Sequence, residues 1–186
     1  LNSFTQRRLR VIGRASSPLM KHLRVGNVKV GSSVEVIESA KLLENSFRLI
    51  NISFINELSF FCSKLGIDVR EVVDAAATKP YGFMPFYPGA GVGGHCIPVD
   101  PMYLATTARE VGAPMRFIEL ANDVNSLMPS FFVGKAEGML GSLSGKKILV
   151  VGVAYKPDVS DVRETPATAL IGRLRAAGAE VSWHDH

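Results

Sequence analysis

An uninterrupted run of 32 residues, from Ser33 to Lys64, contains neither glycine nor proline. Ser32 or Ser33 is a candidate N-cap at its start, because a hydroxyl there accepts a hydrogen bond from an otherwise unpaired backbone amide. We therefore expect one continuous helix over this run, about 48 Å long at about 1.5 Å per residue. So long a helix restricts the possible folds more than any other feature of the chain.

Apolar residues cover more than one side of this expected helix. They are Ile37, Leu42, Leu43, Phe47, Ile50, Phe54, Ile55, Leu58 and Phe61. A helix that is apolar nearly all round needs burial by more than its own small domain. The pattern therefore favours a core that bridges domains or a subunit interface, with a homodimer or higher homo-oligomer formed through this helix.

More helices are expected on both sides of a long loop. One begins at Asp68, and two others are predicted over residues 102–112 and 115–140. The intervening residues 79–101 are rich in glycine and proline and have no periodic signal, which is typical of a functional loop. Residues 32–141 are thus predicted to form an all-helical central domain. Residues 1–31 are predicted to be a poorly defined segment of loops and short strands, the remnant of a preceding domain.

The character of the sequence changes at Lys146. The apolar run "KKILVVGVAY", residues 146–155, is typical of a buried parallel strand. Thr165 as N-cap, followed by Pro166, predicts a helix that ends near Gly178, and "EVSWHDH" begins a second strand. This order predicts the start of a Rossmann-like, doubly wound domain over residues 142–186, truncated after its second strand. The fold class is therefore α/β, with an all-helical central domain before it.

Composition excludes several classes of protein. With 47% hydrophobic and 20% charged residues among 186, the chain is ordinary for a globular protein. Two cysteines are too few for a disulfide scaffold, which favours a reducing, cytoplasmic setting. No run reaches the roughly 18 to 20 apolar residues of a membrane span. The net charge of +4 comes without a nucleic-acid motif, so we expect neither a nucleic-acid nor a membrane partner, and no metal site.

The loop contains the stretch "PFYPGAGVGGHC", in which Gly89, Gly91 and Gly94 satisfy the dinucleotide-binding pattern G-x-G-x-x-G. A genuine fingerprint needs a strand before the first glycine and a helix after the last, because the helix amides bind the pyrophosphate. Prolines on both flanks fit neither element. We therefore predict that these glycines do not hold NAD and instead let the backbone lie close to a ligand.

Cys96 ends this glycine-rich stretch, and two interpretations of it remain open. A cysteine on a loop is often reactive, because loops carry functional groups on a rigid scaffold. A lone cysteine is also commonly a small buried hydrophobe. Cys62, on the long helix, is expected to belong to the core.

Three stretches resemble the UDP-glucose/GDP-mannose dehydrogenase family, whose members are NAD-dependent nucleotide-sugar 6-dehydrogenases. They are "KLLENSFRLINISFINEL" (41–58), "GAGVGGHCIPVDP" (89–101) and "GVAYKPDVSDVRETP" (152–166). The stretch "TKPYGFMPFYPG" (78–89) is similar to the sequences of bacterial members that act on UDP-N-acetylhexosamines. The resemblance implies oxidation of the C6 alcohol of a UDP-sugar to a carboxylate, with two hydrides passed to NAD+, in the synthesis of surface polysaccharide precursors.

The same resemblance implies a set of catalytic residues. Cys96 matches the family nucleophile, which adds to the aldehyde to give a thiohemiacetal and then a thioester. Lys41 matches the lysine that stabilises oxyanions, and Asn45, one helical turn later, the asparagine that holds substrate and water. Asp100 matches the aspartate that assists water or proton transfer. Taken singly, Lys41 also fits a solvated charge, Asn45 a polar break in a buried helix, and Asp100 a turn former.

Six residues are expected to bind the UDP-sugar: Phe86, Tyr87, Gly91, Gly93, Gly94 and Lys156. His95 is interpreted as loop structure rather than as a base for Cys96, because adjacent loop residues often point apart. Arg163 is expected to fix its own loop by pairing with Asp158 or Asp161.

The chain also departs from the family. Members begin with an NAD-binding Rossmann domain, and no strand with a glycine fingerprint stands before residue 32 here. We therefore expect NAD to be bound mainly by a domain outside this sequence, and the isolated chain to be an inactive fragment. A neighbouring subunit supplies a substrate-binding arginine in the family, and the nearest basic residue here is Lys79.

A second hypothesis comes from another functional class. The chain is then a non-catalytic helical dimerisation module, which persists after loss of the cofactor domain, and its long apolar helix supports this. The reactivity of Cys96 discriminates the two, because only a retained active site needs a reactive thiolate.

Overall fold

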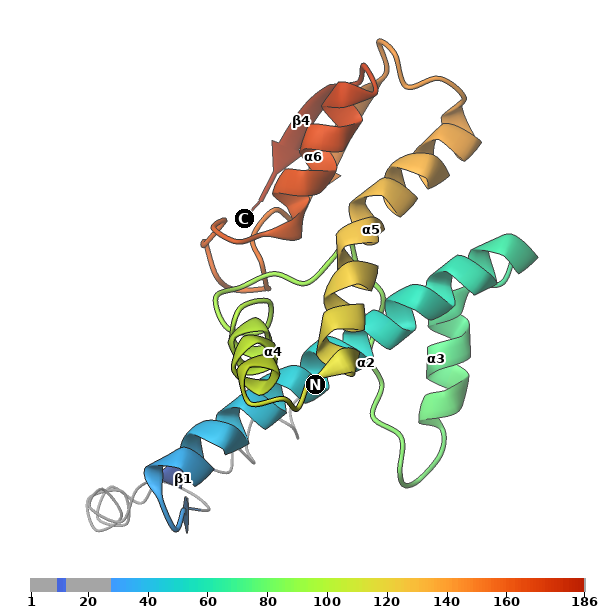
Figure 1. The fold of residues 1–186 in the computed structure, drawn as a ribbon. Helices are drawn as coiled ribbons and strands as arrows, with labels where there is room; N and C mark the ends of the chain where they lie inside the picture. The colour runs from blue at the N-terminus through green and yellow to red at the C-terminus, as the bar shows by residue number, and fades with distance from the viewer. Residues whose placement is uncertain (1–9, 13–27, 186) are drawn as a thin grey trace. The chain divides into compact units, whose positions relative to one another are not determined.

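The computed structural model describes residues 10–12 and 28–185 (Figure 1). The predicted N-terminal segment falls largely on residues 1–9 and 13–27, which lie outside the described residues. The chain divides into two compact units between residues 45 and 46, inside its longest helix. The domain boundaries expected from the sequence remain a prediction.

The first unit contains two short strands and the beginning of the long helix. Strands β1 (Arg10–Ile12) and β2 (Val28–Val30) pair in parallel. Helix α2 (Val34–Leu65) confirms the predicted 32-residue helix, displaced by one residue. It begins as expected at a serine cap, since the hydroxyl of Ser33 accepts a hydrogen bond from the amide of Val36 at 3.4 Å.

Helix α2 ends at a glycine that reverses the chain. Gly66 has a φ of 70°, in the left-handed region where glycine is the residue of lowest steric cost. The amide of Ile67 donates back to the carbonyl of Cys62 at 2.9 Å, which closes the last turn. Cys62 is buried, as expected for a core residue. The chain then passes into α3 (Val69–Ala77), whose N-cap is Asp68 as predicted.

Two further helices follow the long loop, α4 (Asp100–Glu110) and α5 (Arg116–Leu140). The first begins two residues earlier than predicted, so Asp100 lies on a helix and not in the loop. The reason is local. Pro101 is tolerated in the first turn because its missing amide would have no partner there, and the preceding turn is already closed by backbone hydrogen bonds.

One hydrophobic core joins three of these helices within the second unit. Its buried members come from α2, α4 and α5, and they are Leu49, Ala105, Ile118 and Ala121. Val92 and Ile97 of the long loop pack against this cluster. The core therefore fixes the loop at two points, on either side of the residues that carry the proposed chemistry.

The C-terminal residues form a strand, a helix and a second strand. Strands β3 (Lys147–Val151) and β4 (Glu180–His184) pair in parallel, connected by α6 (Pro166–Ala176). The hydroxyl of Thr165 caps the helix by accepting from the amide of Ala167 at 3.3 Å. This is the predicted opening of a Rossmann-like domain, and Figure 1 shows α6 lying along the two strands.

The prediction of a buried strand over residues 146–155 is wrong in two respects. The strand is shorter, and its residues alternate between half-buried and exposed, with Leu149 and Val151 exposed. One face of the two-stranded sheet packs on a cluster that includes Val133 of α5 and Leu174 of α6. Among the described residues nothing comparable covers the other face, and a parallel strand is apolar on both faces only when both are covered.

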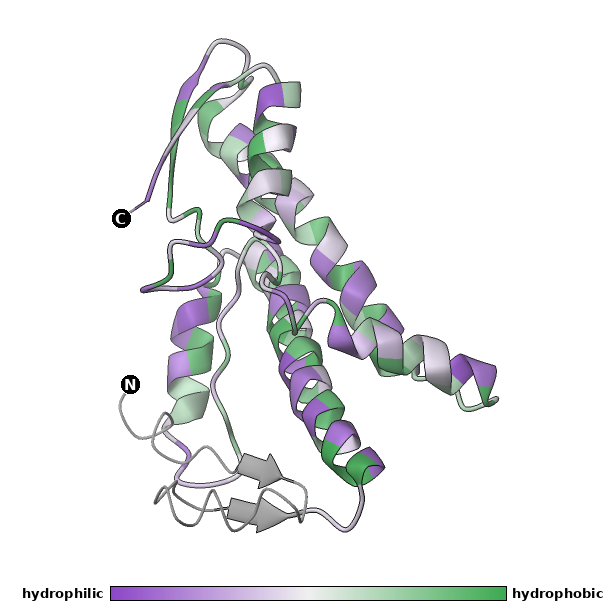
Figure 2. Cartoon of the chain, turned by 90° about the vertical axis from the view of Figure 1, so that its left-hand side faces the viewer, coloured by the Kyte–Doolittle hydropathy of each residue, from purple (hydrophilic) through white to green (hydrophobic). Residues whose placement is uncertain are grey.

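Hydrophobic and hydrophilic residues are mixed along the whole length of the long helices (Figure 2). Accordingly, none of the described helices combines the length and the apolar character that crossing a membrane requires.

Candidate functional site

The glycine-rich loop starts from a buried hydrogen-bond network between α2 and α5. The side chain of Asn56 is fully buried and donates to Asn125 Oδ1 at 2.8 Å. Asn125 in turn donates to the hydroxyl of Ser53 at 2.7 Å. The side-chain oxygen of Asn56 accepts a hydrogen bond from the backbone amide of Gly89 at 3.0 Å. Because the fully buried Asn56 side chain pairs with both Asn125 and the amide of Gly89, the network holds the start of the loop firmly.

Cys96 and Asp100 lie on one tight turn. The carbonyl of Cys96 accepts the amides of Val99 at 3.2 Å and Asp100 at 2.8 Å, so the chain makes a helical turn before α4 begins. Residues four apart on such a turn face the same side. The thiol of Cys96 is exposed, and Asp100 is half-buried and takes part in a polar interaction. The structure thus brings these two predicted residues together.

Lys41 and Asn45 lie on the N-terminal part of α2. Their spacing of four residues places them on one helical face, where Lys41 is exposed and Asn45 is buried. Both take part in polar interactions. They belong to the first compact unit and Cys96 belongs to the second. The joint site of the four predicted catalytic residues therefore remains a prediction.

The two loop aromatics predicted to bind the substrate, Phe86 and Tyr87, are each fixed by a protein contact. The ring of Phe86 packs edge-on against Phe47 of α2, with ring centres 6.0 Å apart. The hydroxyl of Tyr87 donates to Asp74 of α3 at 2.6 Å, and the Arg70 guanidinium lies 5.7 Å from the Tyr87 ring. The hydrogen bond to Asp74 raises the pKa of the Tyr87 hydroxyl, because the phenol is needed as the donor. Substrate contact by either ring remains a prediction.

Gly93 and Gly94, the last two glycines of the loop, let its backbone lie close to the backbone of the segment before α6. A Cβ on Gly93 would lie 2.7 Å from Pro166 Cδ and 2.9 Å from the carbonyl oxygen of Glu164, which is too close. The amide of Gly94 donates to that same carbonyl at 2.9 Å, and Gly94 has a φ of 96°. The missing side chains are therefore needed for packing against the segment before α6. Contact with a sugar is an additional, separate prediction for them.

A charged contact lies directly beside Cys96. The Nε2 atom of His95 is 3.1 Å from Asp161 Oδ2. The guanidinium of Arg163 donates to both oxygens of Asp161, from Nε at 3.0 Å and from the terminal nitrogen at 2.8 Å. The prediction that Arg163 pairs with an acid of its own loop is confirmed, with Asp161 as the acid. The guanidinium and backbone amide of Arg163, and then His95, hold the pKa of the Asp161 carboxyl well below its usual range.

Lys156 is exposed at the beginning of the same segment. Its ammonium lies 5.6 Å from the centre of the Tyr155 ring, at cation–π distance. The other neighbour of that ring is His95, in an edge-on arrangement with centres 6.0 Å apart. The predicted UDP-sugar lysine is thus connected to the Cys96 loop through one aromatic ring.

The loop after β3 is closed by a carboxylate of the chain itself. The amide of Val153 donates to Asp185 at 2.6 Å, and the amide of Ala154 donates to the same oxygen. In dinucleotide-binding folds the amides of this first turn hold a pyrophosphate. The glycine loop does not offer an alternative, because irregular chain precedes Gly89 and five residues separate Gly94 from the next helix. The described residues therefore do not fit a dinucleotide.

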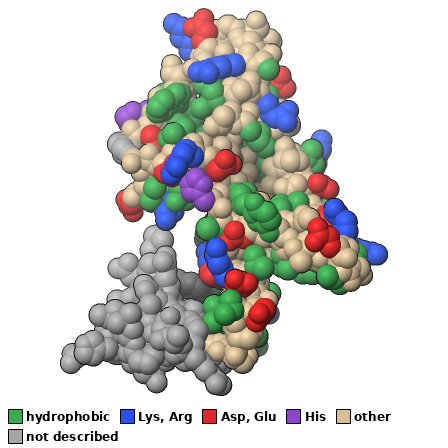
Figure 3. Space-filling model, turned by 60° about the vertical axis from the view of Figure 1, so that its left-hand side comes forward, with side chains coloured by type: hydrophobic (Ala, Val, Ile, Leu, Met, Phe, Trp, Pro, Cys, Tyr) green, Lys and Arg blue, Asp and Glu red, His purple; other side chains and the backbone are tan. Residues whose placement is uncertain are grey.

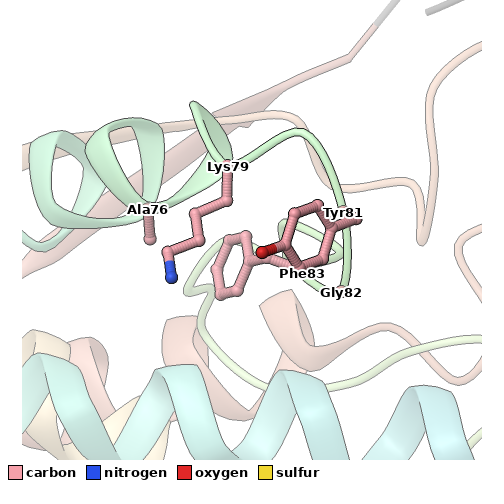
Figure 4. Close-up of a pocket in the computed structure, with 5 residues that line it drawn as sticks. All are labelled: Ala76, Lys79, Tyr81, Gly82 and Phe83. Carbon is pink, nitrogen blue, oxygen red and sulfur yellow. The ribbon is translucent and has the colours of Figure 1, made fainter.

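Two hollows occur in the second unit. The larger, about 400 Å³, is lined by Ala76, Lys79, Tyr81, Gly82 and Phe83. In Figure 4 the Phe83 ring lies between the Tyr81 hydroxyl and the ammonium end of the Lys79 side chain. The smaller, about 320 Å³, lies among the glycine loop, α5 and α6, and of the predicted site residues it includes Gly91. Cys96 lines neither.

Charge on the face drawn in Figure 3 is mixed, with acidic and basic side chains interspersed among hydrophobic ones. Among residues 31–185, no group of three histidine, cysteine or carboxylate side chains is arranged to hold a metal ion. This face therefore offers no field of a single sign that would select a particular macromolecule.

Sequence reasoning missed the residues that position the site. Asn56 and Asn125 lie in apolar helical segments, where an asparagine alone does not indicate a buried partner. Asp161 was considered only as a partner of Arg163, whereas it also contacts His95. These contacts join residues 66 to 69 positions apart, so no local pattern indicates them.

Comparison with known proteins identifies the family. Residues 35–127 match the family model described as "UDP-glucose/GDP-mannose dehydrogenase family, central domain". Residues 149–186 match the UDP binding domain of the same family.

Individual relatives agree with these matches. The chain is 39% identical to the UDP-N-acetyl-D-mannosamine dehydrogenase of Campylobacter jejuni over 80% of its own length and 35% of the relative's. It is 34% identical to the UDP-N-acetyl-D-glucosamine 6-dehydrogenase of Pseudomonas aeruginosa, over 90% of this chain and 40% of that one. A UDP-glucose dehydrogenase structure from Pyrobaculum islandicum superposes with a TM-score of 0.84 at 31% identity, over all of this chain and 44% of that one. The chain thus spans less than half the length of these relatives.

Proposed function

The chain belongs to the UDP-glucose/GDP-mannose dehydrogenase family, and on that basis we propose that it is part of an enzyme that oxidises the C6 alcohol of a UDP-sugar to a carboxylate. The observation that carries the proposal is the exposed thiol of Cys96, one helical turn from Asp100 within the matched central domain. A nucleophile beside a carboxylate is the pair of groups that aldehyde oxidation requires.

Cys96 takes part in the second half of the reaction. The alcohol first loses a hydride and a proton to give an aldehyde. The Cys96 sulfur then bonds to the aldehyde carbon, and the carbonyl oxygen takes up a proton to complete a thiohemiacetal. Loss of a second hydride and that proton gives a thioester. Water hydrolyses the thioester, which releases the carboxylate and restores the thiol, with Asp100 accepting the proton of the attacking water.

Lys41 and Asn45 complete the proposed site from α2. A lysine ammonium stabilises the negative charge that develops on oxygen during addition and hydrolysis. Asn45 is suited to orient substrate and water, because its amide both donates and accepts hydrogen bonds. Their position on one helical face supports the two roles.

NAD+ is the proposed acceptor of both hydrides, as a co-substrate. The described residues do not fit a dinucleotide, since neither the glycine loop nor the turn after β3 presents free amides at a helix N-terminus. NAD+ is therefore bound mainly by residues other than these. We also propose that the 186 residues alone do not turn over.

The proposed substrate is a UDP-N-acetylhexosamine, used to make surface polysaccharide precursors in the cytoplasm. The two sequence relatives, a UDP-N-acetyl-D-mannosamine dehydrogenase and a UDP-N-acetyl-D-glucosamine 6-dehydrogenase, support this choice. On this chain Lys156, the loop aromatics Phe86 and Tyr87, and the glycines Gly91, Gly93 and Gly94 are the proposed contacts to the nucleotide sugar.

A second copy of the chain is the proposed partner of α2. Phe47, Phe54 and Phe61 follow one another at seven-residue intervals and Leu65 is one turn further, and all four are exposed. Residues at this spacing form one stripe on a helix, which we call the α2 stripe. Four large apolar side chains in a row are suited to pack against the same stripe of another subunit.

Removal of the thiol tests the proposed function. In the longest reading frame that contains this chain, we expect Cys96→Ala to lower NADH production from a UDP-sugar by at least about a thousandfold. Cys62→Ala is the matched control, because Cys62 is buried in the core and should affect stability alone. Full turnover by Cys96→Ala would refute the role of Cys96, and lack of oxidation by the unmodified enzyme would refute the function.

The α2 stripe also supports the alternative of a non-catalytic dimerisation module. Alkylation with iodoacetamide near neutral pH, read by peptide mass spectrometry, separates the two. Rapid and selective modification of Cys96, with Cys62 as the buried reference, supports a retained active site. A Cys96 that reacts no faster than a cysteine in an unfolded peptide favours the module.

A further inference from the structure

Residues 155–166, which we call the latch segment, meet the Cys96 loop at several points. The carbonyl of Glu164 accepts the amide of Gly94 at 2.9 Å. His95 contacts Asp161 through Nε2 at 3.1 Å and Tyr155 through the edge of its ring. The contacting residues are 60 to 70 positions apart in sequence. The side chain next to the proposed nucleophile is therefore held by another part of the fold.

The Asp161 carboxylate is held by contacts other than the one to His95. Three donors of Arg163 fix its carboxylate, namely the backbone amide at 3.0 Å, Nε at 3.0 Å and the terminal nitrogen at 2.8 Å. The amide of Tyr155 also donates to the Asp161 carbonyl, at 3.3 Å. Since an ionised carboxylate only accepts hydrogen bonds, the His95 Nε2 carries the proton in this contact. A rigid acceptor thus sets the orientation of the imidazole.

The contact is poorly placed to serve stability. The side chain of His95 is 45% exposed, and exposed pairs of this kind contribute little to the free energy of unfolding. Its position is informative instead. Cys96 lies between His95 on one side and, on the other, the backbone hydrogen bonds that begin α4. Displacing either support moves the thiol.

We propose that His95 is a positioning residue for Cys96, and that it transmits nucleotide-sugar binding from the latch segment to the thiol. The inference rests on the proposed function. Lys156, the proposed UDP-sugar contact, lies against Tyr155, and Tyr155 lies against His95. Substrate held by Lys156 orders the latch segment, which then fixes His95 and the place of the sulfur. Displacement of a reacting group by about 1 Å costs on the order of a hundredfold in rate.

Three variants and a control test this in the longest reading frame that contains the chain. His95→Ala removes the contact, and His95→Gln keeps an N–H donor at the place of Nε2 without a titrating ring. Asp161→Asn weakens the acceptor. Asp158→Asn is the control, because it changes an acid of the same segment, and asparagine tolerates the φ of 61° found there.

We expect His95→Ala to lower kcat about tenfold to a hundredfold with the KM for the UDP-sugar changed less than about threefold. His95→Gln should recover most of that loss, and Asp158→Asn should match the unmodified enzyme. The double variant with Asp161→Asn should be no slower than His95→Ala alone, because both remove one interaction. A His95→Gln enzyme as slow as His95→Ala, or additive losses in the double variant, would overturn the proposal.

Hydrogen exchange gives a readout that does not depend on turnover. His95→Ala should raise amide exchange in peptides of residues 89–99 and 153–165 together, because it releases both sides of one contact. Faster exchange in only one of the two would refute the coupling even if the enzyme is active. If the unmodified enzyme oxidises no UDP-sugar while exchange rises in both peptides, the coupling between loop and latch segment is supported and the proposed function is refuted.

Discussion

Buried hydroxyl groups on α2 differ in whether they are paired. Ser53 Oγ has the carbonyls of Leu49 at 2.7 Å and Ala121 at 3.0 Å as acceptors for its single proton, and it accepts from Asn125. The hydroxyl of Ser46 is also buried but has no hydrogen-bond partner among the described residues. A buried polar group without a partner costs about 1–3 kcal/mol, whereas a paired one is close to neutral or favourable.

Alanine at these two positions should therefore have opposite effects. We expect Ser46→Ala to raise the free energy of unfolding by up to about 1 kcal/mol, because it removes a desolvated group and no hydrogen bond. Ser53→Ala should lower it by about 1–3 kcal/mol, because Asn125 loses its acceptor. Urea unfolding followed by circular dichroism measures both. A clear loss of stability in Ser46→Ala would contradict the unpaired state of that hydroxyl.

The Asp161 carboxyl makes the free energy of unfolding depend on pH, and the direction of its pKa shift fixes the sign. Arg163 and then His95 hold its pKa below the usual range in the folded chain, while an unfolded aspartate takes up a proton near pH 3.9. Below about pH 4 the unfolded state therefore binds more protons, and the stabilisation present at neutral pH is lost as the pH falls.

This predicts how stability differs between the unmodified chain and Asp161→Asn. The difference in the free energy of unfolding should be constant above about pH 5 and should shrink as the pH falls below about 4. Urea unfolding between pH 7 and 3 measures it. A difference that grows on acidification would contradict the direction of the pKa shift.

The glycine loop and the latch segment act together at the scale of elements. The sequence suggests glycines that clear room for a ligand, and the structure shows that Gly93 makes room for Pro166 and the Glu164 carbonyl. Gly89 differs, since a Cβ there would meet only a backbone oxygen, at 3.7 Å. The two glycines therefore have different steric requirements within one pattern.

We expect Gly93→Ala to destabilise the chain by about 1–3 kcal/mol, because the new methyl group forces two backbones apart. Gly89→Ala is the matched control and should have little effect, since its amide keeps the hydrogen bond to Asn56. Thermal unfolding of both variants decides the matter. Equal stabilities would show that the latch segment moves away without cost.

The whole molecule exposes apolar side chains that a single chain leaves uncovered. The α2 stripe runs from Phe47 to Leu65, and Phe54 within it is 61% exposed. A helix face with this many exposed aromatic groups is more typical of an interface than of a solvated surface. Self-association is therefore the property of the molecule that α2 should control.

We expect Phe54→Asp to weaken self-association by at least about a hundredfold, because it places an unpaired charge in an apolar contact. Tyr103→Asp is the control, as Tyr103 is an exposed aromatic residue on α4 outside the α2 stripe. Light scattering coupled to size exclusion measures the mass of each variant. A monomeric unmodified protein, or equal masses of unmodified protein and Phe54→Asp, would contradict the proposed partner.

Local patterns predicted the helices, whereas the proposed catalytic residues rest on the family resemblance of their motifs. The run without glycine or proline, the Asp68 and Thr165 caps and the reversal at Gly66 all act through neighbours in sequence, and the structure has them where local rules place them. The burial of Cys62 follows from its place on the helix, whereas the sequence left the exposure of Cys96 open and the structure decided it. The strand at residue 147 was predicted too long and too buried, because its burial depends on what covers each face of the sheet.

Tertiary structure alone decided what holds the reactive residues in place. The Asn56–Asn125 pair, the closure of the turn after β3 by Asp185 and the contact of His95 with Asp161 each join side chains more than 30 residues apart. Local propensity carries no information about such pairs, because it acts only over the few residues of a turn. The sequence by itself therefore determined the helices and indicated which groups are proposed to carry the chemistry, and the packing of distant segments determined how Cys96 and its loop are positioned.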